Sequence, residues 1–359
     1  MKKTFVCINL VFIVSVNILC QTPKNPNRLK FIVLPLVFYS PDTKLGGGLG
    51  GIVTFNFPKD SINARRSSVT IGAAYTQLNQ FLLYFPFQLY PQNQNYLING
   101  EVGYYRYVYN YFGTGNGFPD DYSEKYSATY PRLRLNVAKK YGSNLYLGVR
   151  YAFDKFTMTA RDSGGLLIKN TITGSNGGLV SGAGLSMTYD TRNQIFYPTG
   201  GWLVDAQVYT EGGYTGSDFN YQRLSIEAAR YIQTTKNTVL VVNAIGIVSL
   251  GDVPFHQLAL LGGGKRLRGY YEGKYRDKDL FVLQSEWRFS IGRRFGGVVF
   301  GGVGGISDKI SHFSIQNTKL NGGIGARFML DKAQHINIRA DYGIGYKSSG
   351  FYLTIGEAF

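Results

Sequence analysis

The chain has 359 residues and a formal net charge of +16, with 15% aromatic residues, 46 glycines and only 17% charged residues. An average soluble domain carries about 25% charged residues and about 7% glycine. The basic residues are scattered singly along the chain rather than gathered in one tract, which argues against a nucleic-acid-binding protein. The composition suits a protein whose outer surface is partly out of water.

The first segment, MKKTFVCINLVFIVSVNILCQ, has two lysines followed by a mostly apolar stretch. This pattern predicts a secretory signal peptide over residues 1–20 and a short lead over 21–28. The alternative, a lipoprotein anchored through Cys20, fits poorly because the residues before Cys20 do not match a lipobox. Since the only cysteines are Cys7 and Cys20, we expect no intramolecular disulfide and no thiolate metal cluster in the mature protein.

After this segment, apolar and polar residues alternate with period two, as in β-strands with one buried face. In WLVDAQVYTE, the alternate residues Trp202, Val204, Ala206 and Val208 are apolar and fall on one face. About sixteen such segments follow one another without a helical segment, and each has room for the roughly 9–11 residues that cross a bilayer as a tilted strand. We therefore predict an all-β fold, a 16-stranded antiparallel transmembrane β-barrel over 29–359. The predicted strands begin at Leu29, Gly46, Arg66, Phe81, Asn95, Lys125, Asn144, Gly178, Gly201, Asp218, Asn237, Asp279, Phe295, Ile315, His335 and Gly350.

The connections between these segments alternate in length, as bacterial outer-membrane barrels require. Short turns such as 233–237 and 292–296 would face the periplasm, and long loops would face outward. The sixth outward loop, about 251–278, contains the charged, glycine-rich stretch LLGGGKRLRGYYEGKYRDKD.

Two motifs resemble a known family. YDTRNQIFYPTGGW, from Tyr189 to Trp202, is similar to the turn motif D-[ST]-R-[DN]-x-x-F-x-P-x-x-G, and RLRGYYEG is similar to the [VIL]-R-G-[FY] signature of the sixth outward loop. Both belong to the BamA, TamA and two-partner-secretion transporter superfamily, the bacterial surface antigen barrels. The matching residues are Asp190, Thr191, Arg192, Asn193, Phe196, Pro198 and Gly201 in the turn and Arg268, Gly269 and Tyr270 in the loop. The plain alternatives are an ordinary turn and a solvated loop arginine.

The resemblance implies an outer-membrane protein that inserts or moves polypeptides or lipids through a seam between its first and last strands. The alternatives are a passive channel with an arginine-biased anion preference and a structural anchor for surface proteins. The chain departs from the family in two ways. It has no segment for the periplasmic POTRA domains and so resembles a short, barrel-only branch, and Gly302 stands where the family tends to place an aspartate.

The same resemblance places the loop tip inside the barrel. A buried Arg268 needs an acidic partner, and Glu286 is the first choice because it follows the loop and faces inward by alternation; Asp205, Glu227 and Asp341 are fallbacks. We expect the seam to be weak because Pro35 in the first strand donates no ladder hydrogen bond, and we expect the barrel to close around Phe359.

No serine and histidine share a recognisable motif, so we expect no enzyme activity, no cofactor and no metal site. We expect as partners the outer-membrane lipids, a client polypeptide or lipid, and assembly or periplasmic proteins in place of the POTRA domains. Basic residues of the periplasmic turns would meet lipid phosphates; they are Lys59, Arg65, Arg66, Lys139, Lys140, Lys236, Arg293, Arg294 and Lys332.

Overall fold

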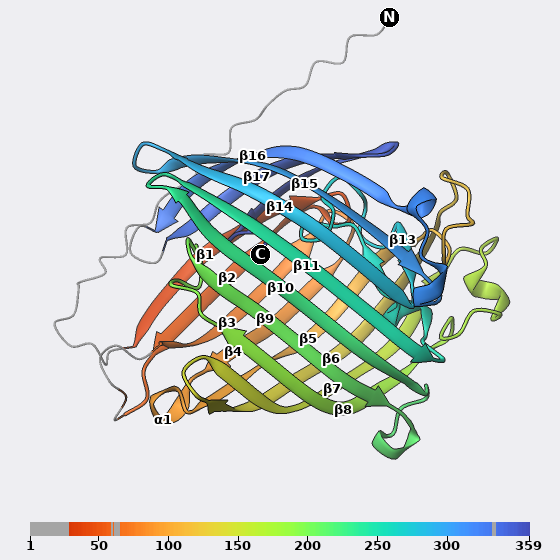
Figure 1. Cartoon of the computed structure of the whole chain (residues 1–359). Helices are drawn as coiled ribbons and strands as arrows, with labels where there is room; N and C mark the ends of the chain where they lie inside the picture. The colour runs from red at the N-terminus through yellow and green to blue at the C-terminus, as the bar shows by residue number, and fades with distance from the viewer. Residues whose placement is uncertain (1–28, 59, 61–64, 332–334) are drawn as a thin grey trace, which may run out of the picture.

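The computed structural model describes residues 29–58, 60, 65–331 and 335–359 and forms one closed antiparallel β-barrel (Figure 1). The predicted signal peptide and lead, 1–28, lie outside the described residues. In the described part, sixteen strands form the barrel, each paired with its neighbours in the chain, and the first strand meets the last. The predicted all-β fold and strand number are confirmed.

The predicted start of each strand lies within four residues of the observed start of a barrel strand. The barrel strands are β1 (Lys30–Ser40), β2 (Lys44–Phe55), β3 (Ser67–Thr76), β4 (Phe81–Leu89), β5 (Tyr96–Tyr111), β6 (Glu124–Tyr141), β7 (Leu145–Arg161), β8 (Gly177–Asp190), β9 (Gly201–Glu211), β10 (Tyr221–Thr235), β11 (Thr238–Gly251), β14 (Asp279–Ile291), β15 (Phe295–Ser307), β16 (Lys319–Asp331), β17 (Ile336–Gly345) and β18 (Ser348–Ile355). A small separate sheet pairs β12 (Ala259–Leu261) with β13 (Tyr275–Asp277). The helices are short: α1 (Pro91–Gln94), η1 (Leu167–Lys169), η2 (Gly213–Thr215), η3 (Phe255–Gln257), η4 (Ile310–His312) and η5 (Ile315–Asn317).

The alternation in the sequence becomes two faces of one sheet. On β14, Leu283 and Trp287 are 49% and 55% exposed on the outer face. Gln284, Glu286 and Arg288 lie between and beside them and are buried on the inner face. Apolar residues outside and polar residues inside are the arrangement of a barrel that stands in a lipid bilayer.

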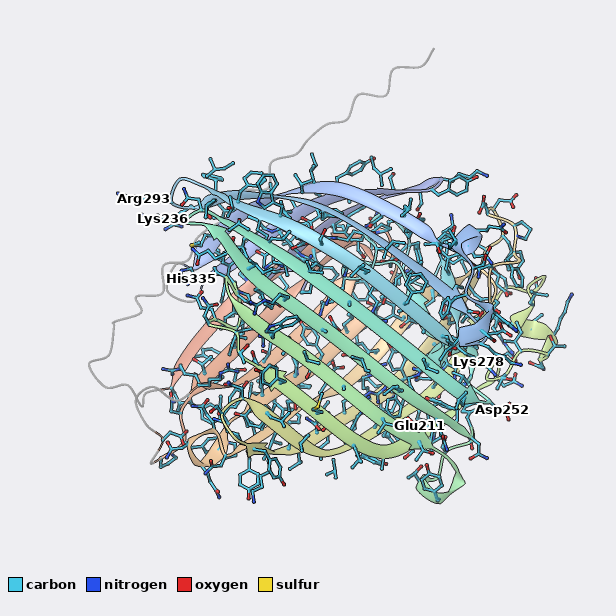
Figure 2. All side chains as sticks on the ribbon, viewed as in Figure 1. Glu211, Lys236, Asp252, Lys278, Arg293 and His335 are labelled. Carbon is cyan, nitrogen blue, oxygen red and sulfur yellow. The ribbon has the colours of Figure 1, made fainter. Side chains whose placement is uncertain are left out.

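The two ends of the barrel differ. Figure 2 shows Lys236, Arg293 and His335 at one end, where the turns are short, and Asp252 and Lys278 at the other, where the long connections gather. The short-turn end is the periplasmic end of such barrels. Across the part of the chain that the structure describes, no helix is both long enough and apolar enough to cross a membrane.

Candidate functional site

The connection between β11 and β14, residues 252–278, is the lumen loop. Its small β12–β13 sheet lies against the inner wall, because Leu261 and Leu267 are fully buried in one apolar cluster with wall residues such as Ile245 and Leu280. The loop tip at Tyr270 is fully buried as well. The long charged loop is thus part of the barrel interior.

The guanidinium of Arg268 holds the centre of a buried charge network. Arg268 is 1% exposed and pairs with two carboxylates, Glu286 on β14 through Nη2 and Asp341 on β17 through Nη1. Its guanidinium carbon also lies 3.5 Å from the ring centre of Phe300 on β15, a cation–π contact. The planar arginine fork suits this double pairing, because each nitrogen serves a different strand.

Other arginines complete the network and extend it toward the periplasmic end. Arg288 donates to Glu286 at 2.8 Å, and Arg327 pairs with Asp341. Arg327 Nε is also 2.9 Å from Glu357, which follows β18. The network has several carboxylates and several arginines, so each buried charge has an opposite neighbour, as burial requires.

The pairing of Arg268 with Glu286 is the one expected from the sequence, but Glu286 does not carry the charge alone. Asp341, a fallback in the sequence analysis, is an equal partner. Gly302 offers no room for the missing aspartate, since a Cβ there would lie 2.7 Å from Gln284 Cβ and 2.9 Å from the Leu283 carbonyl oxygen. The second carboxylate comes instead from Asp341 on β17.

The backbone of the loop tip rests directly on the last strands. Gly269 has φ +113, and a Cβ there would lie 2.8 Å from the Ile344 nitrogen of β17, so only glycine fits without strain. Ser348 Oγ donates to the Gly269 carbonyl at 2.7 Å, and Tyr352 Oη accepts from the Gly269 N–H at 3.0 Å. Tyr270 Oη in turn donates to the Leu320 carbonyl of β16 at 2.8 Å. The tip is therefore fixed to β16, β17 and β18.

A second anchor joins the loop to the opposite side of the barrel closure. The Glu272 N–H donates to Asp42 Oδ1 at 2.7 Å, and Asp42 belongs to the turn between β1 and β2. Burial, with the nearby Glu272 carboxylate, raises the pKa of Asp42 to about 7. Tyr271 packs edge-on against Phe112 of the next long loop. Within a few residues the loop contacts both the last strands and the first hairpin.

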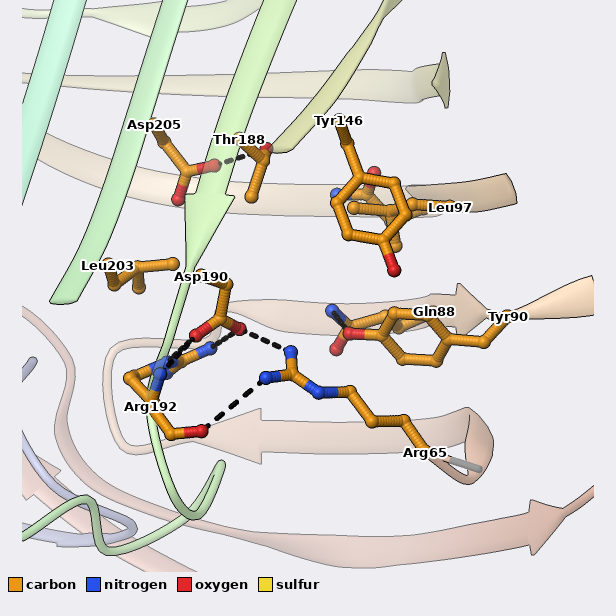
Figure 3. Close-up of a pocket in the computed structure, with 11 residues that line it drawn as sticks. Arg65, Gln88, Tyr90, Leu97, Tyr146, Thr188, Asp190, Arg192, Leu203 and Asp205 are labelled. Atoms are coloured by element: carbon orange, nitrogen blue, oxygen red, sulfur yellow. Dashed lines mark hydrogen bonds and ion pairs between the residues drawn. The ribbon is translucent and has the colours of Figure 1, made fainter. Parts of the chain in front are cut away.

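The turn motif lies at the periplasmic end, where two of its residues, Asp190 and Arg192, help to line a cavity of about 90 Å³ (Figure 3). Asp190 is buried and accepts from Arg192 at 3.0 Å and from Arg65 at 2.6 Å. Arg65 therefore turns inward, and the prediction that it faces lipid phosphate is wrong. Lys59 and Lys332 lie outside the described residues.

The remaining motif residues shape the turn. Thr191 Oγ1 accepts from the Trp202 N–H at 2.8 Å, and Asn193 Oδ1 accepts from the Thr199 N–H at 3.1 Å. Gly201 has φ +104 beside the Thr191 carbonyl. Pro198 is buried, whereas Phe196 is 37% exposed. These contacts close the turn on itself between the end of β8 and the start of β9.

The seam between β1 and β18 is the shortest contact around the barrel. It registers one residue pair, Tyr39 against Leu353, whereas β1 registers eleven pairs with β2 and β18 registers eight with β17. Pro35 lies in β1 opposite Leu49 of β2, with its side chain exposed. The barrel is therefore closed, but only one residue pair is in register across the seam.

Phe359 does not take part in this closure, so that prediction is wrong. β18 ends at Ile355, and the chain then turns inward at Gly356, whose N–H donates to the Asn337 carbonyl. The Phe359 carbonyl accepts from Arg288 Nη2 at 2.8 Å, inside the barrel. The last residues thus meet the same charge network as the loop tip.

Alternation in the sequence predicts that Arg288 and Arg327 face the lumen, but it does not predict which residues they pair with. Partners from strands distant in sequence depend on the register of the closed barrel, and Glu357 was missed altogether. Glu357 follows the last strand, where alternation gives no direction.

Known proteins share this architecture. The Omp85 superfamily domain matches residues 53–359. Among solved structures, the fold is similar to BamA from Haemophilus ducreyi lacking POTRA domains 1–3, with 15% identity and a TM-score of 0.57 over 92% of this chain and 70% of that one. It is also similar to CdiB from Acinetobacter baumannii (11%, 0.57, 92% of this chain and 65% of that one) and CdiB from Escherichia coli (10%, 0.58, 93% and 64%). The chain thus spans just under two thirds of the two CdiB chains. A search of curated protein sequences gave no significant match. With its charged loop tip, its turn motif and this match over most of its length, the chain belongs to the Omp85 superfamily and is a barrel of the bacterial outer membrane.

Proposed function

We propose that this barrel assists the insertion or translocation of polypeptide or lipid at the outer membrane by opening between β1 and β18. The observation that carries the proposal is the single registered pair, Tyr39 against Leu353, at that seam. An open edge of a strand exposes unpaired N–H and C=O groups, which are a template for an incoming strand. The narrow closure leaves much of β1 available for that role.

The lumen loop supports the proposal because it holds both flanks of the seam. Gly269 is hydrogen-bonded to Ser348 and Tyr352 of β18, and Glu272 is hydrogen-bonded to Asp42 in the β1–β2 turn. A loop seated in this way ties the two flanks together from inside. In the proposed cycle, release of the loop tip precedes lateral opening, and reseating follows it.

The role proposed is not enzymatic and needs no cofactor. The position of the loop tip inside the barrel supports this role over a passive anion channel, because a loop there would occupy space that ions need. Client chains, and proteins that bring them to the periplasmic end, are the partners this role requires.

The test is a reversible lock across the seam. Tyr39→Cys with Leu353→Cys places two thiols at the registered pair, and the remaining cysteines, Cys7 and Cys20, lie in the predicted signal peptide. The protein is reconstituted in phospholipid vesicles, and a urea-unfolded outer-membrane barrel is added as client. Folding of the client is followed by its shifted mobility on unheated gels. We expect the reduced protein to accelerate client folding and the oxidised protein to lose that acceleration.

The matched control is Leu49→Cys with Ala73→Cys, which locks the fully paired β2–β3 ladder. Oxidation of this pair is expected to change nothing, and a reductant is expected to restore the locked seam variant. Full acceleration by the oxidised seam variant, or no acceleration by the wild-type protein, would contradict the proposal.

A further inference from the structure

The outer face near the periplasmic end carries an arginine without a carboxylate partner. Arg230 lies on β10 between Ala229 and Tyr231, both buried on the inner face, so its own side chain points to the lipid side. Among the described residues it forms no ion pair, and its guanidinium carbon lies 4.9 Å from the ring centre of Trp202, its register partner on β9. A charged side chain that faces lipid is costly unless it reaches a polar or charged group.

Both tryptophans of the chain lie in this part of the outer face. Trp202 is 41% exposed and Trp287, on β14, is 55% exposed. Trp287 pairs with Leu240 of β11, which pairs with Ile232, two residues from Arg230 on the same face of β10. Neighbouring strands are about 4.8 Å apart, so Trp287 lies about two strand spacings from β10. Tryptophan is enriched where a barrel meets the lipid headgroups.

Exposed cations of two adjoining turns complete the patch. Lys236 lies in the β10–β11 turn, and Arg293 and Arg294 lie in the β14–β15 turn; all three are exposed. The Ser290 N–H donates to the Asn237 carbonyl at 2.9 Å, which joins the two turns, and Figure 2 shows Lys236 and Arg293 at the same end. The segments 228–243 and 287–299 contain no aspartate or glutamate.

We infer that this rim patch, made of Trp202, Arg230, Lys236, Trp287, Arg293 and Arg294, binds the phosphate of an anionic phospholipid from the periplasmic leaflet. Arg230 would reach the phosphate along the face of Trp202, and the turn cations would hold the outer side of the headgroup. The exposed apolar neighbours Ile232 and Ile291 would line the acyl chains. A lipid is favoured over free phosphate because the arginine sits on an apolar, lipid-facing wall. The inference does not depend on the seam.

The intrinsic fluorescence of the two tryptophans reports on lipid bound at the patch, because the chain has no tryptophan elsewhere. The protein is placed in phosphatidylcholine vesicles in which a small fraction of lipid is acyl-brominated phosphatidylglycerol, or acyl-brominated phosphatidylcholine at the same fraction. Bromine quenches a nearby indole. Each cation near an anionic surface is worth roughly a fivefold preference, so we expect brominated phosphatidylglycerol to quench several-fold more effectively. Arg230→Gln is expected to remove most of that difference, and adding Arg293→Gln and Arg294→Gln to abolish it.

The control removes equal charge at the other end through Lys44→Gln, Lys169→Gln and Lys309→Gln, three exposed outward cations. It is expected to keep the preference, and unheated gels confirm that each variant is a folded barrel. As a second readout, native mass spectrometry counts the phosphatidylglycerol retained, which distinguishes bound lipid from free phosphate. Equal quenching by the two lipids in the wild-type protein, an unchanged preference in Arg230→Gln, or an equal loss in the control would each overturn the inference.

Discussion

Replacing Arg268 is the most direct test of whether the lumen loop is a seated plug. Removing one member of a buried charged pair commonly costs about 3–5 kcal/mol, mainly because a charge is left unpaired. Here the carboxylates keep other partners, since Glu286 retains Arg288 and Asp341 retains Arg327. We therefore expect Arg268→Ala to weaken loop seating by about 3 kcal/mol, the lower end of that range, which raises the population of released loop by about two orders of magnitude.

Arg268→Lys keeps the positive charge but removes the planar guanidinium, so it tests how much of the effect depends on the shape of the side chain. The wild-type guanidinium serves Glu286 and Asp341 with different nitrogens, and a single ammonium cannot reproduce that fork. The lysine variant should fall between wild type and Arg268→Ala. Glu286→Gln leaves Arg268 with Asp341, so it should cost less than Arg268→Ala, and the double variant should cost less than the sum of the two.

The assays are single-channel conductance in planar bilayers and limited proteolysis between Lys265 and Lys274. Both should rise together in Arg268→Ala and stay at the wild-type level in Lys309→Ala, which removes an exposed cation from another outward loop. Wild-type conductance in Arg268→Ala would show that the loop is not a plug. Strictly additive costs in the double variant would show that Arg268 and Glu286 act separately.

A substitution at Gly345 and a change of pH test the contacts that hold the lumen loop against the barrel wall. A Cβ on Gly345 would lie 2.2 Å from the Tyr270 ring, so Gly345→Ala should displace the tip and increase proteolysis of the loop, whereas unchanged proteolysis would mean that Tyr270 docks elsewhere. The pKa of Asp42 is raised from 3.8 to about 7, so its proton favours the docked state, and loop seating should weaken as pH rises from about 4 to about 7 and then level off. Proteolysis of the wild-type loop should accordingly be faster at pH 8 than at pH 5. Asp42→Asn should reduce the difference without abolishing it, because the pKa of the neighbouring Glu272 is also raised by burial, and a pH-independent wild-type rate would refute the link.

The barrel was predictable from the sequence because its strands repeat one simple pattern. A period of two along each strand, with apolar residues such as Leu283 and Trp287 on one face, leaves no other way to bury backbone polar groups in lipid than a closed sheet. Alternation also placed Glu286 inward, next to the loop. Alternation does not predict which inward residues meet across the lumen. For this reason the sequence did not predict that Arg268 pairs with Asp341 as well as with Glu286. The inward turn after Ile355 was missed for a related reason, because the resemblance extended the last strand to Phe359.

The charge network connects the lumen loop with the periplasmic end of the barrel. Arg268 enters from the outward end, and Glu357 and the Phe359 carbonyl enter from the periplasmic end. Among the described residues Arg268 makes no direct contact with either of these groups. Arg288, however, donates to both Glu286 and the Phe359 carbonyl, and Arg327 pairs with both Asp341 and Glu357. Withdrawal of Arg268 would leave Glu286 with Arg288, and Asp341 with Arg327 and Arg339. Because Arg288 and Arg327 also hold the chain end, we expect release of the loop to shift the balance of charge around the last residues after β18. Because β18 is also one edge of the seam, we expect loop seating and seam closure to depend on the same buried charges.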